Sequence, residues 1–115
     1  LQRPGEGRAG RDADEDAWGK RVSWVDFNGP VEGEIIGVAM LNHPDSFRYP
    51  TPWHVRSYGL FTANPFALEK VAGEKDSGDV DLAKDQSITL RHRIIFHEGD
   101  EKMAKIAEAW QAYAQ

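Results

Sequence analysis

The feature that most limits the fold is the stretch formed by residues 43–66. It contains four prolines, two histidines, two arginines and six aromatic residues within 24 positions. Each proline holds its φ near about −65°, lacks an amide proton and disfavours helix in the residue before it. Neither a continuous helix nor a central strand can therefore run through this stretch. We predict a stiff connection between strands from Asn42 to about Pro52, which we call the proline-rich connection and which loses little conformational entropy when it orders.

The same stretch holds the best candidates for a binding site. A rigid loop positions its polar groups before a ligand arrives, and this preorganisation favours binding. We expect His43 and His54 to act as catalytic residues, and Trp53, Arg56 and Asn64 to bind the substrate. In the alternative interpretation, the prolines guide the chain across the edge of a sandwich, the aromatic residues are core and the arginines lie on the surface.

Four segments have the composition and the period-two pattern of β-strands. They are residues 21–27, 31–41, 53–63 and 87–99. The Asn28-Gly29-Pro30 sequence between the first two segments is a turn signal, and it predicts an antiparallel hairpin. We expect Trp24 to be a core residue and Asp26 to cap this turn.

The last segment, residues 100–115, has a helical pattern. Asp100 is a candidate N-cap and is followed by Glu101 in the first turn, where a carboxylate is favourable. Apolar residues recur at helical spacing at Met103, Ile106, Ala107, Trp110 and Ala114. One amphipathic helix of about four turns is therefore predicted.

Strands separated by long connections and followed by one helix indicate a mostly β fold. We predict an antiparallel β-sandwich in which residues 20–115 form the C-terminal part of a single domain and residues 1–19 form a flexible loop or arm. The sequence begins without Met. We therefore expect further strands upstream in the same polypeptide, and these would be partners of the sheet edges.

The histidines and one carboxylate give two further chemical hypotheses. His92 and His97 are five positions apart on one predicted strand, so they face opposite sides. A metal site would combine His43, His54 and one of that pair, but no recognised metal-binding spacing is present, and we assign no metal ligands. Glu98, at the end of the same strand, either acts as a catalytic acid or base or begins the helix.

Composition excludes several classes of function. The formal net charge is −5, and binding to a nucleic-acid backbone requires clustered Lys and Arg, so we expect no nucleic-acid partner. The absence of cysteine excludes disulfides, thiolate nucleophiles and zinc sites built on sulfur. No apolar run approaches the roughly 20 residues that span a bilayer, so we expect no membrane insertion. Whether a cofactor is used, and which one, stays open, and so does the compartment, with the periplasm and secretion among the alternatives.

Several words of the sequence occur together in a known protein family. They are WGKR, WVDFNGPV, NHP, PTPWHVRSYGLF, NPF and LRHRIIFHEGD, spread over residues 17–100. In these words the chain resembles a bacterial family named methane oxygenase PmoA-like. The resemblance implies a large soluble β-sandwich, similar in outline to the mutarotase-like sandwiches that handle sugars. After NPF this sequence continues with ALEKV, where relatives often have a glycine.

Three functional hypotheses follow. The first is a carbohydrate-binding or carbohydrate-processing β-sandwich, whose ligand is a glycan or another small molecule. The family name implies instead a metal-dependent oxygenase or oxidoreductase. The third hypothesis is a non-catalytic structural domain. Since one fold supports many functions, only the arrangement of the candidate residues can distinguish these hypotheses.

Overall fold

The computed structural model of the chain describes residues 8–9, 21–56 and 60–115. Its larger sheet has four strands in the order β1-β2-β3-β6. These strands are β1 (Arg8–Ala9), β2 (Trp24–Val31), β3 (Glu34–Asn42) and β6 (His92–Glu98). Strand β3 is antiparallel to both of its neighbours, whereas β1 runs parallel to β2. The smaller sheet is an antiparallel pair, β4 (Trp53–Arg56) and β5 (Leu60–Ala63).

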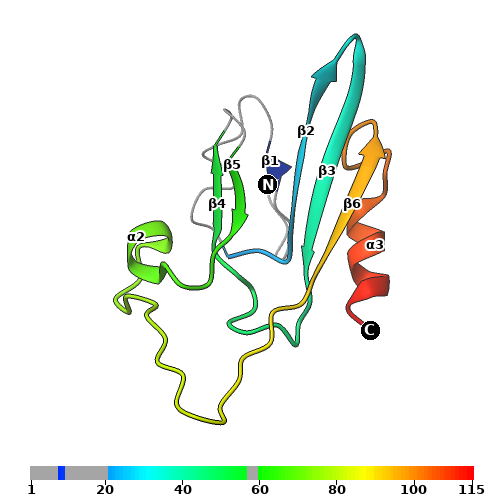
Figure 1. Cartoon of the computed structure of the whole chain (residues 1–115). Coiled ribbons are helices and arrows are strands. Elements are labelled where there is room, and N and C mark those ends of the chain that lie inside the picture. The colour runs from blue at the N-terminus through cyan, green and yellow to red at the C-terminus, as the bar shows by residue number, and fades with distance from the viewer. Residues whose placement is uncertain (1–7, 10–20, 57–59) are drawn as a thin grey trace.

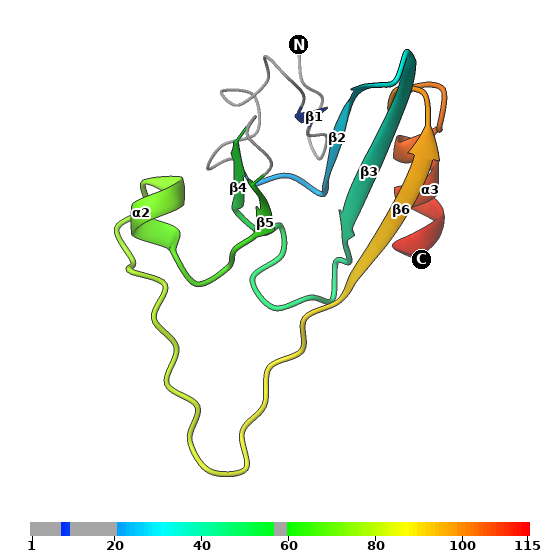
Figure 2. The ribbon, with the colours of Figure 1, turned by 45° about the horizontal axis from the view of Figure 1, so that its top comes forward.

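These elements form layers (Figure 1). The β4–β5 pair packs on one face of the larger sheet, and helix α3 (Ile106–Tyr113) packs on the other face. A short helix, α2 (Leu68–Ala72), follows β5, and the connection formed by residues 73–91 loops away from both sheets before it enters β6 (Figure 2). The predicted antiparallel β-sandwich with a C-terminal helix is confirmed.

Two hydrophobic clusters, one on each face of the larger sheet, hold the layers together. The cluster between the sheets contains the buried residues Val22, Val25, Trp53 and Val55. The cluster beneath α3 contains the buried residues Trp24, Ala39, Leu41 and Ile106. Neighbouring residues of β2 enter different clusters because successive side chains of a strand point to opposite faces. The prediction that Trp24 is a core residue is confirmed, since only 5% of its surface is exposed.

The β2–β3 hairpin is present, but the predicted position of its turn is wrong. Asn28, Gly29 and Pro30 lie within β2, and Val31 pairs with Glu34 across a two-residue turn. That turn is Glu32-Gly33, with φ values of 51° and 85°. Two positive φ values are typical of a type I′ turn, whose twist matches that of the flanking strands. The geometry of the hairpin thus favours a glycine in the second turn position over the Asn-Gly pair upstream.

The last strand and the last helix are both shorter than predicted. Strand β6 begins at His92, whereas residues 87–91 lie outside any strand. Asp100 accepts hydrogen bonds from the backbone amides of Lys102 and Met103, as expected of a cap, but it caps only a turn. Lys105 then adopts a φ of 55°, which is not helical, and α3 begins at the next residue. The side chain of Met103 consequently lies outside the core stripe and is exposed.

Other predicted segments differ in detail. The third predicted strand, residues 53–63, is the β4–β5 pair, and residues 57–59 between them lie outside the described part of the chain. Most of the predicted N-terminal arm also lies outside the described residues, although its residues Arg8–Ala9 form β1. None of the helices in the described ranges is long and apolar enough to cross a membrane.

Candidate functional site

Strand β4 divides its side chains between the core and the opposite face. Trp53 and Val55 are fully buried against the larger sheet. His54 and Arg56 alternate with them, are half-buried, and therefore lie on the other side of the β4–β5 pair. Thr62 of β5 is the cross-strand neighbour of His54. The structure thus brings two of the expected site residues onto one surface, which we call the outer face of β4.

The surroundings of His54 favour its neutral form. Burial lowers the pKa of His54, and the nearby positive charge of Arg56 lowers this pKa further. A neutral imidazole has one nitrogen that donates and one that accepts a hydrogen bond, while a guanidinium is a permanent cation with several donors. Side by side, the two groups are able to hydrogen-bond hydroxyl groups and to hold a carboxylate.

Trp53, which was expected to bind the substrate, is a core residue in the structure. Its side chain is fully buried between the sheets and packs against Phe61, with ring centroids 6.0 Å apart. Its indole Nε1 donates a 2.9 Å hydrogen bond to the backbone carbonyl of Val22. An indole with both its faces and its polar group engaged in this way has no surface left for a ligand.

Asn64 and His43 are occupied by local hydrogen bonds. The side-chain oxygen of Asn64 accepts the amide of Phe66 at 3.1 Å and closes a turn after β5. The Nδ1 of His43 accepts the amide of Asp45 at 3.0 Å, and the buried imidazole meets the ring of Tyr113 edge to face. Both side chains therefore shape the backbone around them.

The two expected catalytic residues of the larger sheet lie at opposite ends of it. Glu98 pairs with Ile36 at one end of the β3–β6 ladder. His43 directly follows Asn42, which pairs with His92 at the other end. At about 3.4 Å per residue, the two ends of this ladder are roughly 20 Å apart. Glu98 and His43 cannot act on one bond as an acid–base pair.

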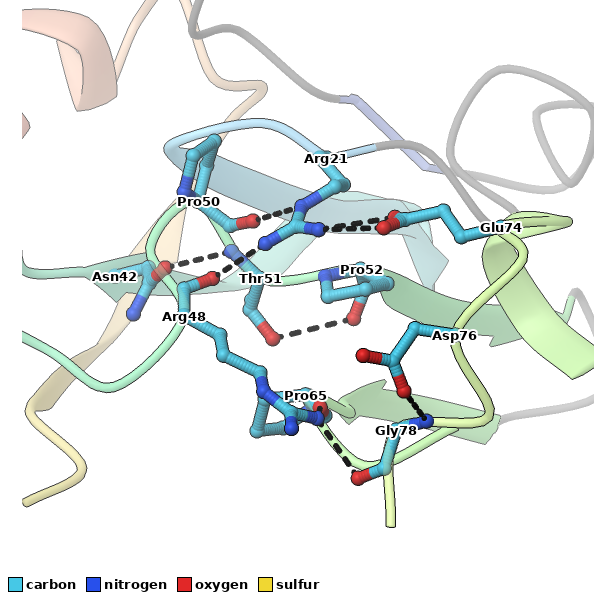
Figure 3. A network of polar contacts seen from close by, with 10 residues as sticks. All are labelled: Arg21, Asn42, Arg48, Pro50, Thr51, Pro52, Pro65, Glu74, Asp76 and Gly78. Atoms are coloured by element: carbon cyan, nitrogen blue, oxygen red, sulfur yellow. Dashed lines mark hydrogen bonds and ion pairs between the residues drawn. The ribbon is translucent and has the colours of Figure 1, made fainter. Parts of the chain in front are cut away.

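Arg48 holds the proline-rich connection to two other loops. Arg48 adopts a positive φ of 57°, and its Nη1 donates to the backbone carbonyls of Pro65 and Gly78, both at 2.7 Å (Figure 3). One side chain thereby ties together three segments that are far apart in the sequence. From the sequence alone, Arg48 could be a surface residue or a ligand-binding residue. In the structure its guanidinium anchors two loops.

Arg21 anchors the same region from the other side (Figure 3). Its guanidinium donates to the carbonyl oxygens of Pro50 and Arg48 at 2.8 and 2.9 Å. Its Nη1 also lies within hydrogen-bond distance of both carboxylate oxygens of Glu74, at 3.0 and 2.9 Å, and forms an ion pair with them. Hydrogen bonds between two charged groups are stronger than those between neutral groups. The guanidinium groups of Arg21 and Arg48 thus donate to backbone carbonyls and hold the proline-rich connection against the neighbouring segments.

A buried polar cluster that sequence reasoning did not find lies on the α3 side of the larger sheet. Asp26 is fully buried, and its carboxylate is hydrogen-bonded to the imidazole Nε2 of His97. Asn28 donates to Asp26 at 2.6 Å and to Glu101 at 3.0 Å. His97 reaches Asp26 by crossing Gly37, where a Cβ atom would lie only 2.6 Å from the imidazole Cε1. We call Asp26, Asn28, His97 and Glu101 the buried polar cluster.

Two members of this cluster have shifted pKa values. Burial raises the pKa of the Asp26 carboxyl, against the hydrogen bonds from Asn28 and His97 that lower it. Burial alone would lower the pKa of His97, but the hydrogen bonds to Asp26 and to the Glu98 carbonyl outweigh it, so this pKa is raised. Both groups keep their protons to a higher pH than they would in an unfolded chain. The cluster is a hydrogen-bonded support beneath the segment that leads into α3.

The expectation that Asp26 caps the hairpin turn is therefore wrong. The turn lies further along the chain, and the Asp26 carboxylate points into the buried polar cluster instead. The signal that identifies the cluster is a row across three strands, Asn28–Gly37–His97, which depends on the strand register. Periodicity within a single strand does not contain this information.

The described residues contain no group of three or more His, Cys, Asp or Glu side chains arranged to hold a metal ion. The hypothetical metal-ligand set of His43, His54 and one further histidine is accordingly not gathered in the described part of the chain. His43 is at the end of β3, His54 is on β4, and His97 is bound to Asp26.

Comparison with known proteins identifies a family for this chain. Residues 4–111 match the model of a family of unknown function, DUF6807. The chain belongs to this family. No curated protein and no solved structure matches the chain significantly. The match covers both sheets, α2, most of α3 and the proline-rich connection, but the family model assigns no activity to any of them.

Proposed function

We propose that this DUF6807 chain is a carbohydrate-recognition module of a β-sandwich, and that the outer face of β4 is its ligand-binding surface. The observation that carries the proposal is the alternation along β4, which places the imidazole of His54 and the guanidinium of Arg56 on the same face. Arg56 would hold a carboxylate or a ring oxygen, and His54 would hydrogen-bond hydroxyl groups. Sugars and sugar acids present these groups together.

The packing of the other two residues of β4 also supports the proposal. Trp53 and Val55 are locked in the core, so the backbone that carries His54 and Arg56 is held by packing on its other side. Side chains on a rigid strand are better preorganised than side chains on a loop. The resemblance to the PmoA-like proteins, with their similarity in outline to sugar-handling sandwiches, agrees with this proposal.

A thermal-shift screen tests the proposal directly. Glucose, galactose and glucuronate serve as probes, since a ligand that binds only the native state stabilises it by about 2.7 kcal/mol at 100 times its Kd. We expect at least one of these probes to raise the melting temperature, and His54→Ala and Arg56→Ala each to abolish the shift. Arg91→Ala is the matched control, because it removes an arginine that pairs with Asp45 outside β4. Absence of any shift, or a shift that both β4 variants retain, would contradict the proposal.

A second candidate function, a non-catalytic structural domain, is favoured by the Arg21 and Arg48 network. In this case the polar residues of the proline-rich connection serve only folding. No sugar would then raise the melting temperature, and Arg48→Ala would only lower it. The same screen therefore separates the two candidates. The metal-dependent oxygenase that the PmoA-like name implies has less support, because the described residues contain no converging ligand set.

A further inference from the structure

Strand β6 stands at one end of the larger sheet (Figures 1 and 2). It pairs with β3 on one side, and among the strands that the structure describes it has no neighbour on the other side. We call this second side the outer edge of β6. The strand is seven residues long and contains no proline and no lysine. Natural edge strands are usually protected by such residues, by bulges or by a covering element, so this edge has the character of a pairing surface.

The hydrogen bonds to β3 determine which residues face the outer edge. The amide of Gly99 donates to the carbonyl of Ile35 at 2.7 Å, and the amide of His43 donates to the carbonyl of Arg91 at 3.0 Å. These two contacts flank β6 and establish that odd-numbered positions bond to β3. In an antiparallel ladder the direction of the backbone groups alternates from residue to residue. The backbone groups of even-numbered residues therefore point to the outer edge: His92, Ile94, Phe96 and Glu98.

The side chains of these even-numbered residues share one face of the sheet. Ile95 packs toward α3, so its neighbours Ile94 and Phe96 lie on the opposite face. There, 55% of Ile94 and 83% of Phe96 are exposed. Ile36, the cross-strand neighbour of Glu98 on the same face, is 40% exposed. An apolar surface adjoining an unpaired strand edge marks an interaction site.

We propose that a second copy of this chain covers this surface, with the two β6 strands paired antiparallel about a two-fold axis at Ile95. This register places Ile94 against Phe96 of the second copy, and His92 against Glu98 of the second copy. The two-fold axis repeats both pairs in reverse. All four pairs join residues whose backbone groups face the outer edge, so the two Ile94–Phe96 pairs are each able to exchange two hydrogen bonds. The Glu98 carbonyl already lies 3.2 Å from the His97 Nδ1, and its second lone pair is able to accept the amide of His92. The inference is independent of the proposed sugar site, which lies on β4.

The sequence of β6 is self-complementary in this register. Ile94 and Phe96 form an aliphatic–aromatic cross-strand pair, which stabilises antiparallel sheets. The Nε2 of His92 contacts the side-chain amide of Asn42 at 3.3 Å, so the Nδ1 is the nitrogen able to donate a hydrogen bond to the carboxylate of Glu98 opposite it. Other registers lose this match. A shift by two residues in one direction would place Phe96 against itself, and a shift in the other direction would place His92 opposite Phe96.

On the other face of the paired strands, two basic residues meet in this register. Arg93 and His97 are opposite each other in the same register, and both can be positively charged. However, the guanidinium of Arg93 lies over the ring of Tyr113, 4.5 Å from its centroid. The imidazole of His97 is turned across Gly37 toward Asp26, which is away from the outer edge. Each charge is thus compensated within its own copy.

Sedimentation equilibrium of the full chain over a wide range of protein concentration tests the proposal. We expect a monomer–dimer equilibrium, and we expect Ile94→Lys and Phe96→Lys each to leave only monomer. Leu82→Lys is the matched control, since Leu82 is a 53% exposed apolar residue in the connection that precedes β6. It should leave the equilibrium unchanged, and circular dichroism should show all three variants folded.

A charge exchange provides a second test of the register. Glu98→Lys should weaken the dimer, and adding His92→Glu to it should restore association, because the cross-strand pair is then rebuilt with reversed roles. A chain that stays monomeric at every concentration would overturn the proposal. A dimer that persists in both lysine variants would also overturn it, since another surface would then be the interface. Monomers whose Ile94 and Phe96 amides resist hydrogen exchange would show that another segment of the polypeptide covers the edge, which equally excludes the β6 pairing.

Discussion

On the α3 side of the larger sheet, β6 contributes His97 to the buried polar cluster, whereas on the opposite side it exposes Ile94 and Phe96. The polar residue is inside and the apolar residues are outside, which inverts the common arrangement of a half-buried strand. The two faces of β6 show that a side chain is buried when another element covers its face, whether that side chain is polar or apolar. Asp26 and His97 lie on the face that α3 covers. Because they have little access to water there, they must satisfy their hydrogen bonds with protein groups.

The largest effect should come from breaking the buried ion pair. We expect His97→Ala to lower the free energy of unfolding by about 3–5 kcal/mol, because it leaves the buried Asp26 carboxyl without its partner. Urea denaturation measures this change. Arg91→Ala is the control, since it breaks a pair whose acidic partner, Asp45, is exposed, and exposed pairs contribute at most about 1 kcal/mol. Equal costs for the two variants would show that the α3 side is not a buried environment.

The next effect concerns the glycine over which His97 lies. We expect Gly37→Ala to cost about 1–3 kcal/mol, since the new methyl group would overlap the imidazole and lie 2.9 Å from the Cβ of Asn28. Gly29→Ala is the matched control, because a methyl group at that position would have nothing within 4 Å, and we expect a change within about 0.5 kcal/mol. In a His97→Ala background the cost of Gly37→Ala should fall, and a double-mutant cycle measures that coupling. Full additivity would contradict the packing argument.

A smaller effect should appear in the pH dependence of stability. The pKa of His97 is raised in the folded state, so the folded chain binds more protons than the unfolded chain above the ordinary histidine value of about 6.5. Its contribution is therefore complete below that value and is lost as the pH rises through the folded-state pKa. Urea midpoints measured across this range should fall less steeply in His97→Gln than in the original chain.

His92→Gln is the control for this slope. Burial lowers the pKa of His92, so this histidine makes stability increase as the pH rises toward about 6.5. Its removal should change the pH profile in the opposite sense and below the range affected by His97. Two variants with identical profiles would show that neither histidine is titrating in the environment that the structure gives it.

The smallest effect is expected on the exposed side of β6. In dilute protein, where the chain is monomeric, Phe96→Thr should change the free energy of unfolding by no more than about 0.5 kcal/mol, because little of its surface is buried. Leu41→Ala, on the covered face of β3, should cost about 2–5 kcal/mol. Urea denaturation of both variants compares the two faces directly. A large cost for Phe96→Thr in the monomer would mean that this face is covered within one chain.

Composition and periodicity were sufficient for the fold class. Alternating β-branched residues predicted the strands, and the apolar spacing of Ile106, Ala107 and Trp110 predicted the helix that packs on them. Both signals are local, so a single sequence contains them. The turn of the first hairpin was misplaced because Asn28-Gly29 and Glu32-Gly33 both satisfy local turn chemistry. Only the pairing of the whole strands distinguishes them.

The candidate site was predictable only in part. His54 and Arg56 are two positions apart, so they lie on the same face of a strand in any fold that places them in one. By contrast, the partners of Arg48, the burial of Trp53 and the contact between Asp26 and His97 were decided by tertiary structure. These contacts join residues up to 71 positions apart in the chain. The sequence by itself thus determined which side chains are neighbours along a strand. The stacking of layers decided which of them are buried, because burial depends on what covers a face and not on the residues within it.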